Sequence, residues 1–420
     1  MIISKTTAEC LNQIWKSERD SVKNRNRTPY LRAFFSCTRV PGAAGYKEDI
    51  RVLTETRIKD IPELKVHGRT TDCREPLTLF WTASGFECNV TGSELWVELE
   101  VTYETYEPWF SYTVNGDWVG RQMLQKGRYW VPLFRGMSPQ NVKNVHFYKD
   151  LQAMSGDGHS YIHVHALRHD GSFVPVAEKK LKIEFIGDSI TSGEGLFGAK
   201  QEWDWIPMFF SAIKSYAYQT AKALDAEYRV FSQSGWGVYN TWDNNTQGAI
   251  PKYYREICSL MPGEECRRLG GHAPHDFKSW PPDVVVVNLG TNDAASFDQP
   301  EWVDERTGEL HKMRRNPDGS YCMEDVNAFE QAVKDFLKLI RSCNPNADIV
   351  WCYGMLGIGF QLYLCEAIAA YIRENKDYRV SYLQLPNTTE ESVGSREHPG
   401  YLCHQQAAKV LTEHIQKMLP

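Results

Sequence analysis

The order of hydrophobic and polar positions changes character near residue 180. Before this point, short runs rich in β-branched and aromatic residues are separated by turn residues, with no convincing helical period between them. These runs are residues 94–103, 108–119, 127–134, 144–150 and 161–171. The Asn115-Gly116 pair inside the second run is typical of a tight hairpin turn. The pattern predicts an antiparallel all-β sandwich or jelly roll.

After residue 180, strand-like and helix-like segments alternate. Apolar runs predict buried strands at residues 182–186, 228–231, 284–289, 349–353 and 380–385. Helical periods bring apolar residues to one face within residues 213–224, 326–340 and 408–418. This alternation predicts a three-layer α/β domain, with a parallel sheet between two layers of helices.

We therefore predict two domains, which the length of 420 residues also favours. Residues 1–180 are expected to form an N-terminal helix and a β-sandwich, and residues 181–420 the α/β domain. The helix is expected within residues 1–20, which have neither the apolar region nor the cleavage site of a signal peptide.

Composition narrows the expected partners and compartment. A net charge of −6 gives no basic surface for nucleic acid or an anionic membrane. No stretch approaches the ~18 consecutive apolar residues of a membrane span. The 11 cysteines are scattered without CxxC pairs, which favours reduced thiols in a cytoplasmic protein. Pairing of Cys258 with Cys266, which flank a short loop, stays open.

Polar residues suited to acyl transfer follow the predicted strands. In parallel sheets, functional sites form at the carboxyl ends of the strands. Ser189 follows the first strand, Gly235 the second and Asn292 the third. His398 precedes the last helix and belongs to a loop, because Pro399 disfavours helical geometry in the residue before it.

These residues together supply a nucleophile, a base and hydrogen-bond donors. A serine hydroxyl needs an adjacent base to attack, and His398 is the predicted base for Ser189. The predicted oxyanion hole consists of the Ser189 N–H, the Gly235 N–H and the Asn292 side-chain amide, with Gly237 as a competitor for Gly235. Each motif alone is weak, since Gly, Asp and Ser are common in turns and helix caps. Their conjunction, each after its own strand, argues against coincidence.

The four motifs IEFIGDSITSGEG, SGWG, NLGTND and EHPG resemble the motif blocks of the SGNH, or GDSL-type, hydrolases. The resemblance covers residues from about 181 to 420 and implies a flavodoxin-like hydrolase fold. It implies catalytic and oxyanion roles for Ser189, Gly235, Asn292 and His398. A β-sandwich ahead of such a domain, and the run NVHFYKDLQAM, further resemble carbohydrate esterase family 2. Members of that family remove acetyl groups from plant polysaccharides such as xylan and glucomannan.

The sequence departs from the family pattern three residues before His398. The family usually has an Asp there, which orients the imidazole, whereas this chain has Ser395. Glu397 is adjacent to His398, but neighbouring side chains in an extended loop point apart. We therefore predict a Ser–His dyad in which His398 Nδ1–H donates to a backbone carbonyl. The Ser395 hydroxyl and a distant carboxylate are the alternative partners.

Aromatic residues after the first two site loops are candidate platforms for sugar rings. The predicted substrate contacts are Trp236, Tyr239, Glu194 and Trp280, with core packing as the alternative for each aromatic. Further candidates of the same kind are Trp203, Trp205, Trp242 and Trp302. The charged, glycine-rich residues 263–275, inside a long insertion at 251–282, are expected to form an exposed loop or lid.

His163 and His165 lie two apart on one predicted strand, as metal ligands do in cupin sandwiches. No Glu follows shortly afterwards, so a polar outer strand face is the preferred interpretation. No other Cys/His spacing suggests zinc, and Ser189 chemistry needs no metal or other cofactor.

The predicted function is that of a carbohydrate acetyl esterase acting through an acyl-enzyme on Ser189. The expected partner is an acetylated oligo- or polysaccharide, not nucleic acid or a membrane, and the oligomeric state is open. Two alternatives remain. One is a GDSL-type thioesterase or lysophospholipase acting on longer acyl chains, and the other is a glycan-binding protein with a degenerate catalytic domain.

Overall fold

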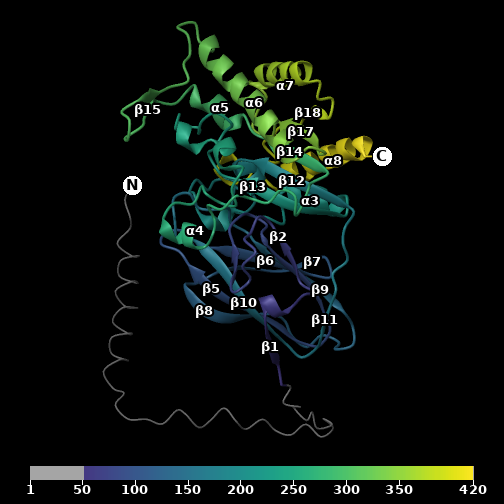
Figure 1. Cartoon of the computed structure of the whole chain (residues 1–420). Coiled ribbons are helices and arrows are strands. Elements are labelled where there is room, and N and C mark those ends of the chain that lie inside the picture. Colours follow the sequence, from purple (N-terminus) through teal and green to yellow (C-terminus); the bar gives the residue numbers. More distant parts are fainter. Residues whose placement is uncertain (1–51, 420) are drawn as a thin grey trace, which may run out of the picture. The chain divides into compact units, whose positions relative to one another are not determined.

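The computed structural model describes residues 52–419, and the chain from Val52 onward forms one compact unit (Figure 1). The helix expected within residues 1–20 lies outside the described residues. Strands pair antiparallel from Thr54 to Val174, and a parallel sheet begins at Leu181. The pairing thus changes where the sequence pattern changes, while the division into two domains at residue 180 stays a prediction.

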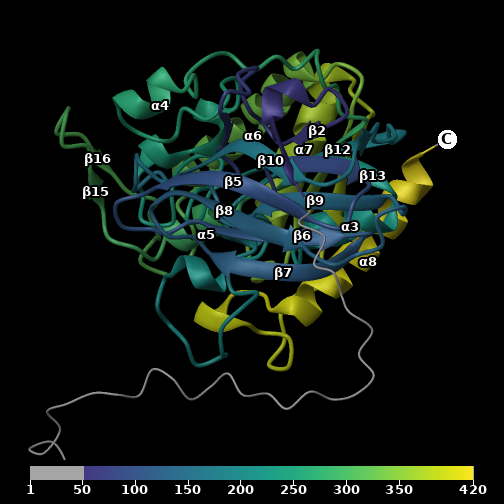
Figure 2. The same ribbon diagram turned by 90° about the horizontal axis from the view of Figure 1, so that it is seen from below.

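Two antiparallel sheets form the first half of the described chain. One contains β1 (Thr54–Arg57), β3 (Leu77–Leu79), β5 (Leu95–Thr102), β8 (Gly127–Phe134) and β10 (Tyr161–His169). The other contains β2 (Lys65–His67), β4 (Gly85–Val90), β6 (Trp109–Val114), β7 (Asp117–Met123), β9 (Lys143–Lys149) and β11 (Phe173–Val174). Figure 2 views the molecule from the end at which these two sheets lie, so that strands of both are visible.

Side chains from both sheets share one core, which confirms the predicted sandwich. Leu99 of β5 and Ile162 of β10 are fully buried together with Phe147 of β9 from the other sheet. The β6–β7 hairpin turns at Asn115 and Gly116, whose φ angles of 53° and 83° suit a tight turn. The finer expectation of a jelly roll stays a prediction.

The parallel sheet has the strand order of flavodoxin-like folds. Its strands, in spatial order, are β13 (Ala226–Ser232), β12 (Leu181–Gly187), β14 (Val284–Asn288), β17 (Asp348–Tyr353) and β18 (Val380–Gln384). Every one of these strands overlaps one of the apolar runs, which confirms the prediction of a parallel sheet. Buried residues without polar alternation characterise such strands, because both faces are covered.

Helices cover both faces of this sheet. Those on one face are α3 (Tyr216–Ala223) and α8 (Tyr401–Met418), and those on the other are α6 (Met323–Cys343) and α7 (Gln361–Asn375). On β14, Val286 packs toward α3 and α8, whereas Val285 and Val287 pack toward α6 and α7. The predicted helices correspond to α3, α6 and α8, while α7 was not predicted.

Shorter elements occupy the loops. They are the helices α2 (Ser189–Ser192), α4 (Glu264–Arg268) and α5 (Thr291–Ser296), the hairpin strands β15 (Trp302–Val303) and β16 (Leu310–His311), and the 3-10 turns η1 (Ile58–Asp60), η2 (Pro207–Phe209), η3 (Thr246–Gly248), η4 (Ile250–Tyr253) and η5 (Ser395–Glu397). Among the described residues, every helix is too short or too polar to cross a membrane.

The insertion at residues 251–282 packs partly against the core, whereas its charged segment at 263–275 is mostly exposed or half-buried, as expected for an exposed loop. Cys258 and Cys266 are buried, and the Trp81 indole of the sandwich donates to the Ile257 carbonyl at 2.7 Å. Both cysteines are free thiols, so the open question of their pairing is answered in favour of reduced thiols. The insertion therefore contacts both the sandwich and the α/β layers.

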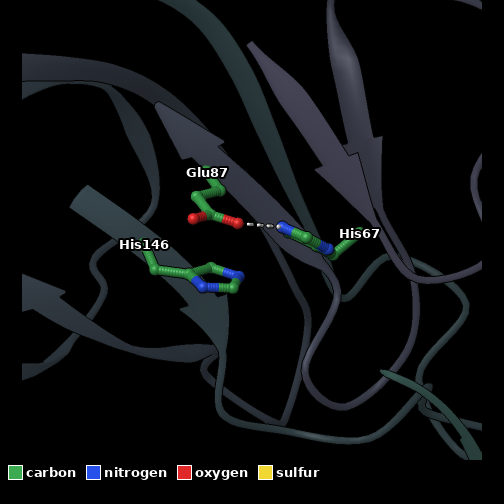
Figure 3. Close-up of side chains that lie close together, drawn as sticks. All are labelled: His67, Glu87 and His146. Atoms are coloured by element: carbon green, nitrogen blue, oxygen red, sulfur yellow. Dashed lines mark ion pairs between the residues drawn. The ribbon is translucent and has the colours of Figure 1, made fainter. Parts of the chain in front are cut away.

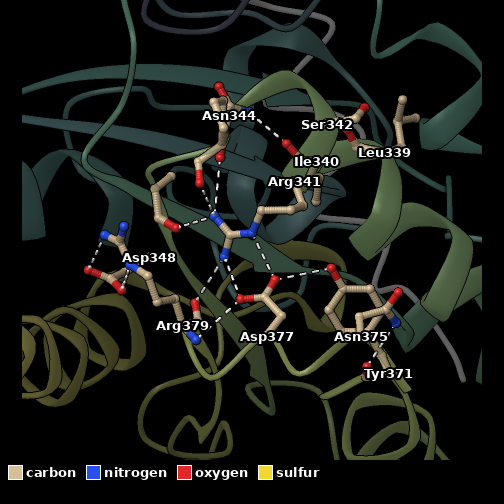
Figure 4. Close-up of polar contacts among 12 residues, drawn as sticks. Leu339, Ile340, Arg341, Ser342, Asn344, Asp348, Tyr371, Asn375, Asp377 and Arg379 are labelled. Carbon is tan, nitrogen blue, oxygen red and sulfur yellow. Dashed lines mark hydrogen bonds and ion pairs between the residues drawn. The ribbon is translucent and has the colours of Figure 1, made fainter. Parts of the chain in front are cut away.

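Arg341 fastens the end of α6 to its neighbours (Figure 4). Its guanidinium donates to both carboxylate oxygens of Asp377, at 2.8 and 3.1 Å, and to the Ala347 carbonyl at 2.6 Å. It also donates to the Asn344 carbonyl at 3.2 Å, just past the helix, where backbone carbonyls lack intrahelical partners. The Tyr371 hydroxyl of α7 donates to the same Asp377 at 3.1 Å. One side chain thus links both helices of this face.

A buried ion pair joins the sandwich to the parallel sheet. Arg69, which follows β2, donates through Nη2 to Glu184 Oε1 on β12 at 2.9 Å, and both residues are buried. The Tyr254 hydroxyl donates to the second oxygen of Glu184 at 2.5 Å. Arg69 also donates to the Tyr254 carbonyl at 2.6 Å. These bonds compensate the desolvation of both charges.

Replacing Arg69 with Met is expected to lower the free energy of unfolding by about 3–5 kcal/mol, because the Glu184 carboxylate would stay buried without its partner. The matched control is Arg135→Met, which breaks the exposed pair with Glu94 and should cost at most about 1 kcal/mol. Urea unfolding measures both values. Equal losses in the two variants would contradict the role given to Arg69.

Candidate active site

A pocket of about 520 Å³ opens at the carboxyl ends of the parallel strands. Loops of the parallel sheet and loops of the sandwich both line it. Ser189, Gly235, Asn292 and His398 are all among the lining residues. The structure thus brings the four sequence-predicted residues to one place.

Ser189 and His398 are in hydrogen-bond contact. Ser189 is the first residue of α2, and Asp188 caps this short helix by accepting the Ile190 N–H at 3.0 Å. Ser189 Oγ lies 3.0 Å from His398 Nε2. That distance lies in the range that direct proton transfer between hydroxyl and imidazole requires.

A backbone carbonyl holds the other nitrogen of the imidazole. His398 Nδ1 lies 3.0 Å from the Arg396 carbonyl oxygen, which is the kind of contact predicted from the sequence. Arg396 and Glu397 have φ angles of 55° and 56°, and this left-handed turn aims the carbonyl at the ring. Because Nδ1 must donate to a carbonyl, Nε2 is left as the acceptor for the serine proton.

The Ser395 side chain forms a hydrogen bond to a loop carbonyl and not to the imidazole. Its hydroxyl donates to the Phe197 carbonyl at 3.0 Å, and its side chain is buried. Glu397 is exposed and does not line the pocket. The alternative of Ser395 as the partner of His398 is therefore wrong.

Glu194 is a buried carboxylate beside the imidazole. Its Oε1 lies 3.7 Å from His398 Nε2 and accepts the Arg396 Nε–H at 3.0 Å. Its Oε2 accepts the Trp205 indole N–H at 3.3 Å, and the side chain is 2% exposed. Glu194 lines the pocket, as predicted for a substrate contact, but its oxygens face protein groups.

Gly235, and not Gly237, lines the pocket. Gly235 has a φ of 79°, which glycine adopts without strain. The Gly237 N–H donates to the Asn240 carbonyl at 2.8 Å, so it is not free to bind a ligand. A Cβ on Gly237 would lie 2.3 Å from Asp293 Oδ2. The competition between the two glycines is thereby resolved in favour of Gly235.

Residues of the sandwich form hydrogen bonds to the loop that contains Gly235, and the sequence analysis did not predict these contacts. Gln152, fully buried after β9, accepts both the Ser234 N–H and the Ser234 hydroxyl at 2.9 Å. Gln233 donates to the Ser155 hydroxyl at 3.1 Å. No local sequence signal marks Gln152 or Ser155, because their partners are about 80 residues away.

Asp293 is a second residue whose role sequence reasoning missed. Its carboxylate accepts the backbone N–H groups of Val238 at 3.0 Å, Tyr239 at 2.8 Å and Asn240 at 3.3 Å. Burial raises the pKa of Asp293 to about 6. The residue anchors the turn after Gly235, and its position next to Asn292 in NLGTND was the available signal.

Asn292 directs its side-chain amide at two protein acceptors. Nδ2 donates to Asp188 Oδ2 at 3.2 Å and to the Trp236 carbonyl at 3.1 Å. Both bonds are long, so an anion bound beside Ser189 can share or replace one of them. Burial raises the pKa of Asp188 to about 7.

Three predicted substrate contacts lie outside the pocket lining. The Trp236 ring packs against Tyr253, with centroids 5.1 Å apart. Tyr239 lines a different hollow near β16. Trp280 donates to Glu227 at 3.0 Å, at the amino end of β13 and thus at the opposite edge of the sheet. Local sequence order alone did not reveal these orientations.

Other aromatic residues form the pocket wall. Trp205 and Trp242 line it together with Tyr106 from the sandwich, and Trp242 is 47% exposed. Trp203, at 61% exposure, lines an adjacent hollow, and Trp302 stacks on His311 in the β15–β16 hairpin. Of the candidate aromatic residues, Trp205 and Trp242 therefore lie at the pocket, whereas Trp236 does not.

His163 and His165 do not form a cupin-like pair. His163 is buried and lies 2.9 Å from the Thr78 hydroxyl, so the expected polar outer face is wrong for this residue. His165 Nε2 lies 2.8 Å from Glu100 Oε2. The register of β10 shifts between them, and neither belongs to a potential metal cluster in the described part of the chain.

Comparison with known proteins gives consistent results. Residues 185–384 match the GDSL-like Lipase/Acylhydrolase family. The chain is 45% identical to the structure of an acetyl xylan esterase, Est2A, from the rumen bacterium Butyrivibrio proteoclasticus, with a TM-score of 0.86 over 87% of this chain and 98% of that one.

Two more distant similarities extend over most of the chain. A family two carbohydrate esterase from Clostridium thermocellum, solved with cellohexaose, shares the fold at 24% identity and a TM-score of 0.70, over 84% of this chain and 98% of that one. Cellulase/esterase CelE of Acetivibrio thermocellus is 27% identical over 87% of this chain. The chain spans 41% of the length of that relative.

The stability of this site should depend on pH through Asp188. Its pKa is raised to about 7 by burial, so protonation favours the folded state. Relative to Asp188→Asn, the wild-type chain is expected to be most stable below about pH 4 and to lose stability as the pH rises through about 7. Urea unfolding of both proteins across this range measures the difference, and a constant difference would contradict the assignment.

Proposed function

The chain belongs to the GDSL-type hydrolases, within which it resembles the family 2 carbohydrate esterases, and we propose that it removes O-acetyl groups from xylan, glucomannan and their oligosaccharides. The observation that carries this proposal is the 3.0 Å contact between Ser189 Oγ and His398 Nε2 inside a pocket with an aromatic wall. Aromatic faces suit sugar rings, and the similar Est2A is named an acetyl xylan esterase.

The first step is attack of Ser189 Oγ on the acetyl carbonyl carbon while His398 Nε2 takes the serine proton. The carbonyl oxygen becomes an oxyanion, which the Ser189 N–H, the Gly235 N–H and the Asn292 amide stabilise. The Asn292 amide gives up one of its two hydrogen bonds to protein acceptors and donates to this oxygen instead. The positions of all these donors in one pocket support the assignment.

The proton that His398 took from Ser189 is then passed to the leaving group. His398 donates it to the sugar oxygen, the bond from this oxygen to the acetyl carbon breaks, and the sugar leaves as an alcohol. A water molecule, deprotonated by His398, then attacks the acetyl carbon of the acyl-enzyme. Acetate leaves, and Ser189 regains its proton.

Glu194 provides the negative charge that an Asp provides in a catalytic triad. When His398 carries the serine proton, its ring is positively charged, and the buried Glu194 carboxylate lies 3.7 Å from Nε2. The same carboxylate holds the Arg396 side chain, whose backbone carbonyl accepts the Nδ1 proton. Orientation therefore comes from the backbone, and charge stabilisation from Glu194.

The charged groups beside Ser189 favour a short acyl group on a polar carrier. Glu194 and Arg396 line the pocket together with Asn292, whereas a long acyl chain requires an apolar trough. Acetate release from acetylated xylan, glucomannan and their oligosaccharides, followed by NMR, tests the proposal. Preference for octanoyl over acetyl nitrophenyl esters would favour the thioesterase or lysophospholipase alternative, and glycan binding without acetate release would favour the non-catalytic one.

Ser189→Ala is expected to reduce acetate release by on the order of 10⁴-fold or more, because the nucleophile and base act as a unit. Ser395→Ala is the matched control, since its hydroxyl bonds the Phe197 carbonyl. It should retain activity within about tenfold, which corresponds to ~1.4 kcal/mol. Initial rates on acetylated xylan measure both. Substantial turnover by Ser189→Ala would remove Ser189 from its role.

Glu194→Gln is expected to lower kcat on p-nitrophenyl acetate by about tenfold or more with little change in KM, because its charge acts in the transition state. Glu397→Gln, which removes an exposed neighbouring carboxylate, should leave kcat unchanged. Steady-state kinetics on this sugar-free ester separate the two roles of Glu194. A loss confined to acetylated oligosaccharides and to KM would make it a substrate contact instead.

A further inference from the structure

A cluster of two histidines and a glutamate lies on the sandwich, apart from the pocket described above (Figure 3). His67 ends β2, Glu87 lies on β4 and His146 on β9, which are adjacent strands of one sheet. Glu87 is directly opposite His146, and Lys65, two residues before His67, is opposite Glu87. Since side chains alternate along a strand, the register puts all three side chains on one face.

This face is turned toward the α/β layers and is largely shielded from water. Tyr148, two residues after His146 on the same face, is buried in the core that contains α3 and α8. His67 is 8% exposed and Glu87 is 9% exposed. Polar groups in such a position need partners, because burial without them is unfavourable.

The ligand atoms of the cluster converge. One nitrogen of each imidazole and one carboxylate oxygen lie within 4.8 Å of one another. His67 Nε2 is 3.4 Å from Glu87 Oε2, and the imidazole centroids are 4.3 Å apart. Ligands bound tetrahedrally to one zinc ion at ~2.0–2.2 Å lie about 3.4 Å apart. The contact between His67 and Glu87 already has this length, and a ligand atom near the 4.8 Å limit has to move closer by about 1 Å.

A supporting contact orients the carboxylate. Asn144 donates to Glu87 Oε1 at 2.7 Å, which leaves Oε2 directed at the histidines. Ligating carboxylates in metal sites are commonly held in this way. His146 Nε2 is buried and makes no hydrogen bond within the described part of the chain. An unpartnered buried imidazole nitrogen in a cluster that contains a carboxylate is an independent indication that a ligand binds there.

A neighbouring lysine on this face has acidic partners outside the cluster. Lys65 on the same face is paired with Glu227 and with Glu178, which balance its charge.

We propose that His67, Glu87 and His146 bind a divalent transition-metal ion, with Zn²⁺ as the representative cation. Two imidazoles and one carboxylate form a ligand set that zinc and non-haem iron use with at least one open coordination position. The ion would cross-link three adjacent strands where the sandwich meets the α/β layers. This proposal is independent of the esterase chemistry, since none of the three residues lines the active-site pocket.

Zinc titration of the chelator-treated full chain, without a histidine tag, tests the proposal by calorimetry. The wild-type chain is expected to bind one equivalent of Zn²⁺ with micromolar or tighter affinity and to unfold at a higher temperature with the metal present. Glu87→Gln and His146→Asn should each weaken binding by at least about tenfold. Glu87→Gln keeps the shape of the side chain and its acceptor for Asn144.

The matched control is His159→Asn, in a second group with Glu104 and Asp157. There Asp157 already accepts backbone N–H groups, from Thr105 at 2.8 Å among others, and His159 is exposed. This variant should bind zinc as the wild-type chain does. Visible absorption of the Co²⁺-loaded wild-type chain is a second measurement of binding, and it requires no variant. No stoichiometric binding, unchanged binding in both cluster variants, or loss in His159→Asn would each overturn the proposal.

Discussion

The contact between Ser189 Oγ and His398 Nε2 joins residues 209 positions apart, and the remaining architecture serves to hold it. Ser189 is fixed by the end of β12, an interior strand of the parallel sheet. His398 is fixed by the turn that precedes α8, a helix packed on the same sheet. A hydrogen bond of 3.0 Å tolerates little movement, so both supports must be rigid. The sheet supplies that rigidity through its close-packed core.

In the proposed mechanism, two groups share the task that a triad Asp performs alone. A triad Asp both orients the imidazole and stabilises its charge. Here the Arg396 carbonyl orients the ring, and Glu194 brings the negative charge from another loop. The Arg396 side chain binds Glu194 at 3.0 Å, which couples the two groups. The arrangement depends on a left-handed turn at Arg396 and Glu397, a conformation that costs free energy and persists because the surrounding bonds enforce it.

Much of this architecture could be predicted from the sequence, because strand and helix periods are local. The parallel strands appear as unbroken apolar runs, and the four site loops follow them in order. Helix α7 was not predicted because apolar residues occur on all its sides, so that its buried stripe of Leu364, Ala367, Ile368 and Tyr371 does not stand out in the sequence. The roles of Gln152 and Glu194 rest on contacts between distant segments, which no local pattern encodes. For the same reason the sequence does not reveal that half-buried Trp236 packs against Tyr253 while Trp242 lines the pocket.

The proposed mechanism requires that Ser189, activated by His398, carries the acyl group during turnover. Mass spectrometry of the chain, acid-quenched within milliseconds of mixing with p-nitrophenyl acetate and then digested, detects this intermediate. We expect one added acetyl group on the peptide that contains Ser189, and none on the same peptide when His398 is replaced by Ala. An acetyl group on another residue, or turnover without any acetylated peptide, would show that Ser189 does not carry the acyl group.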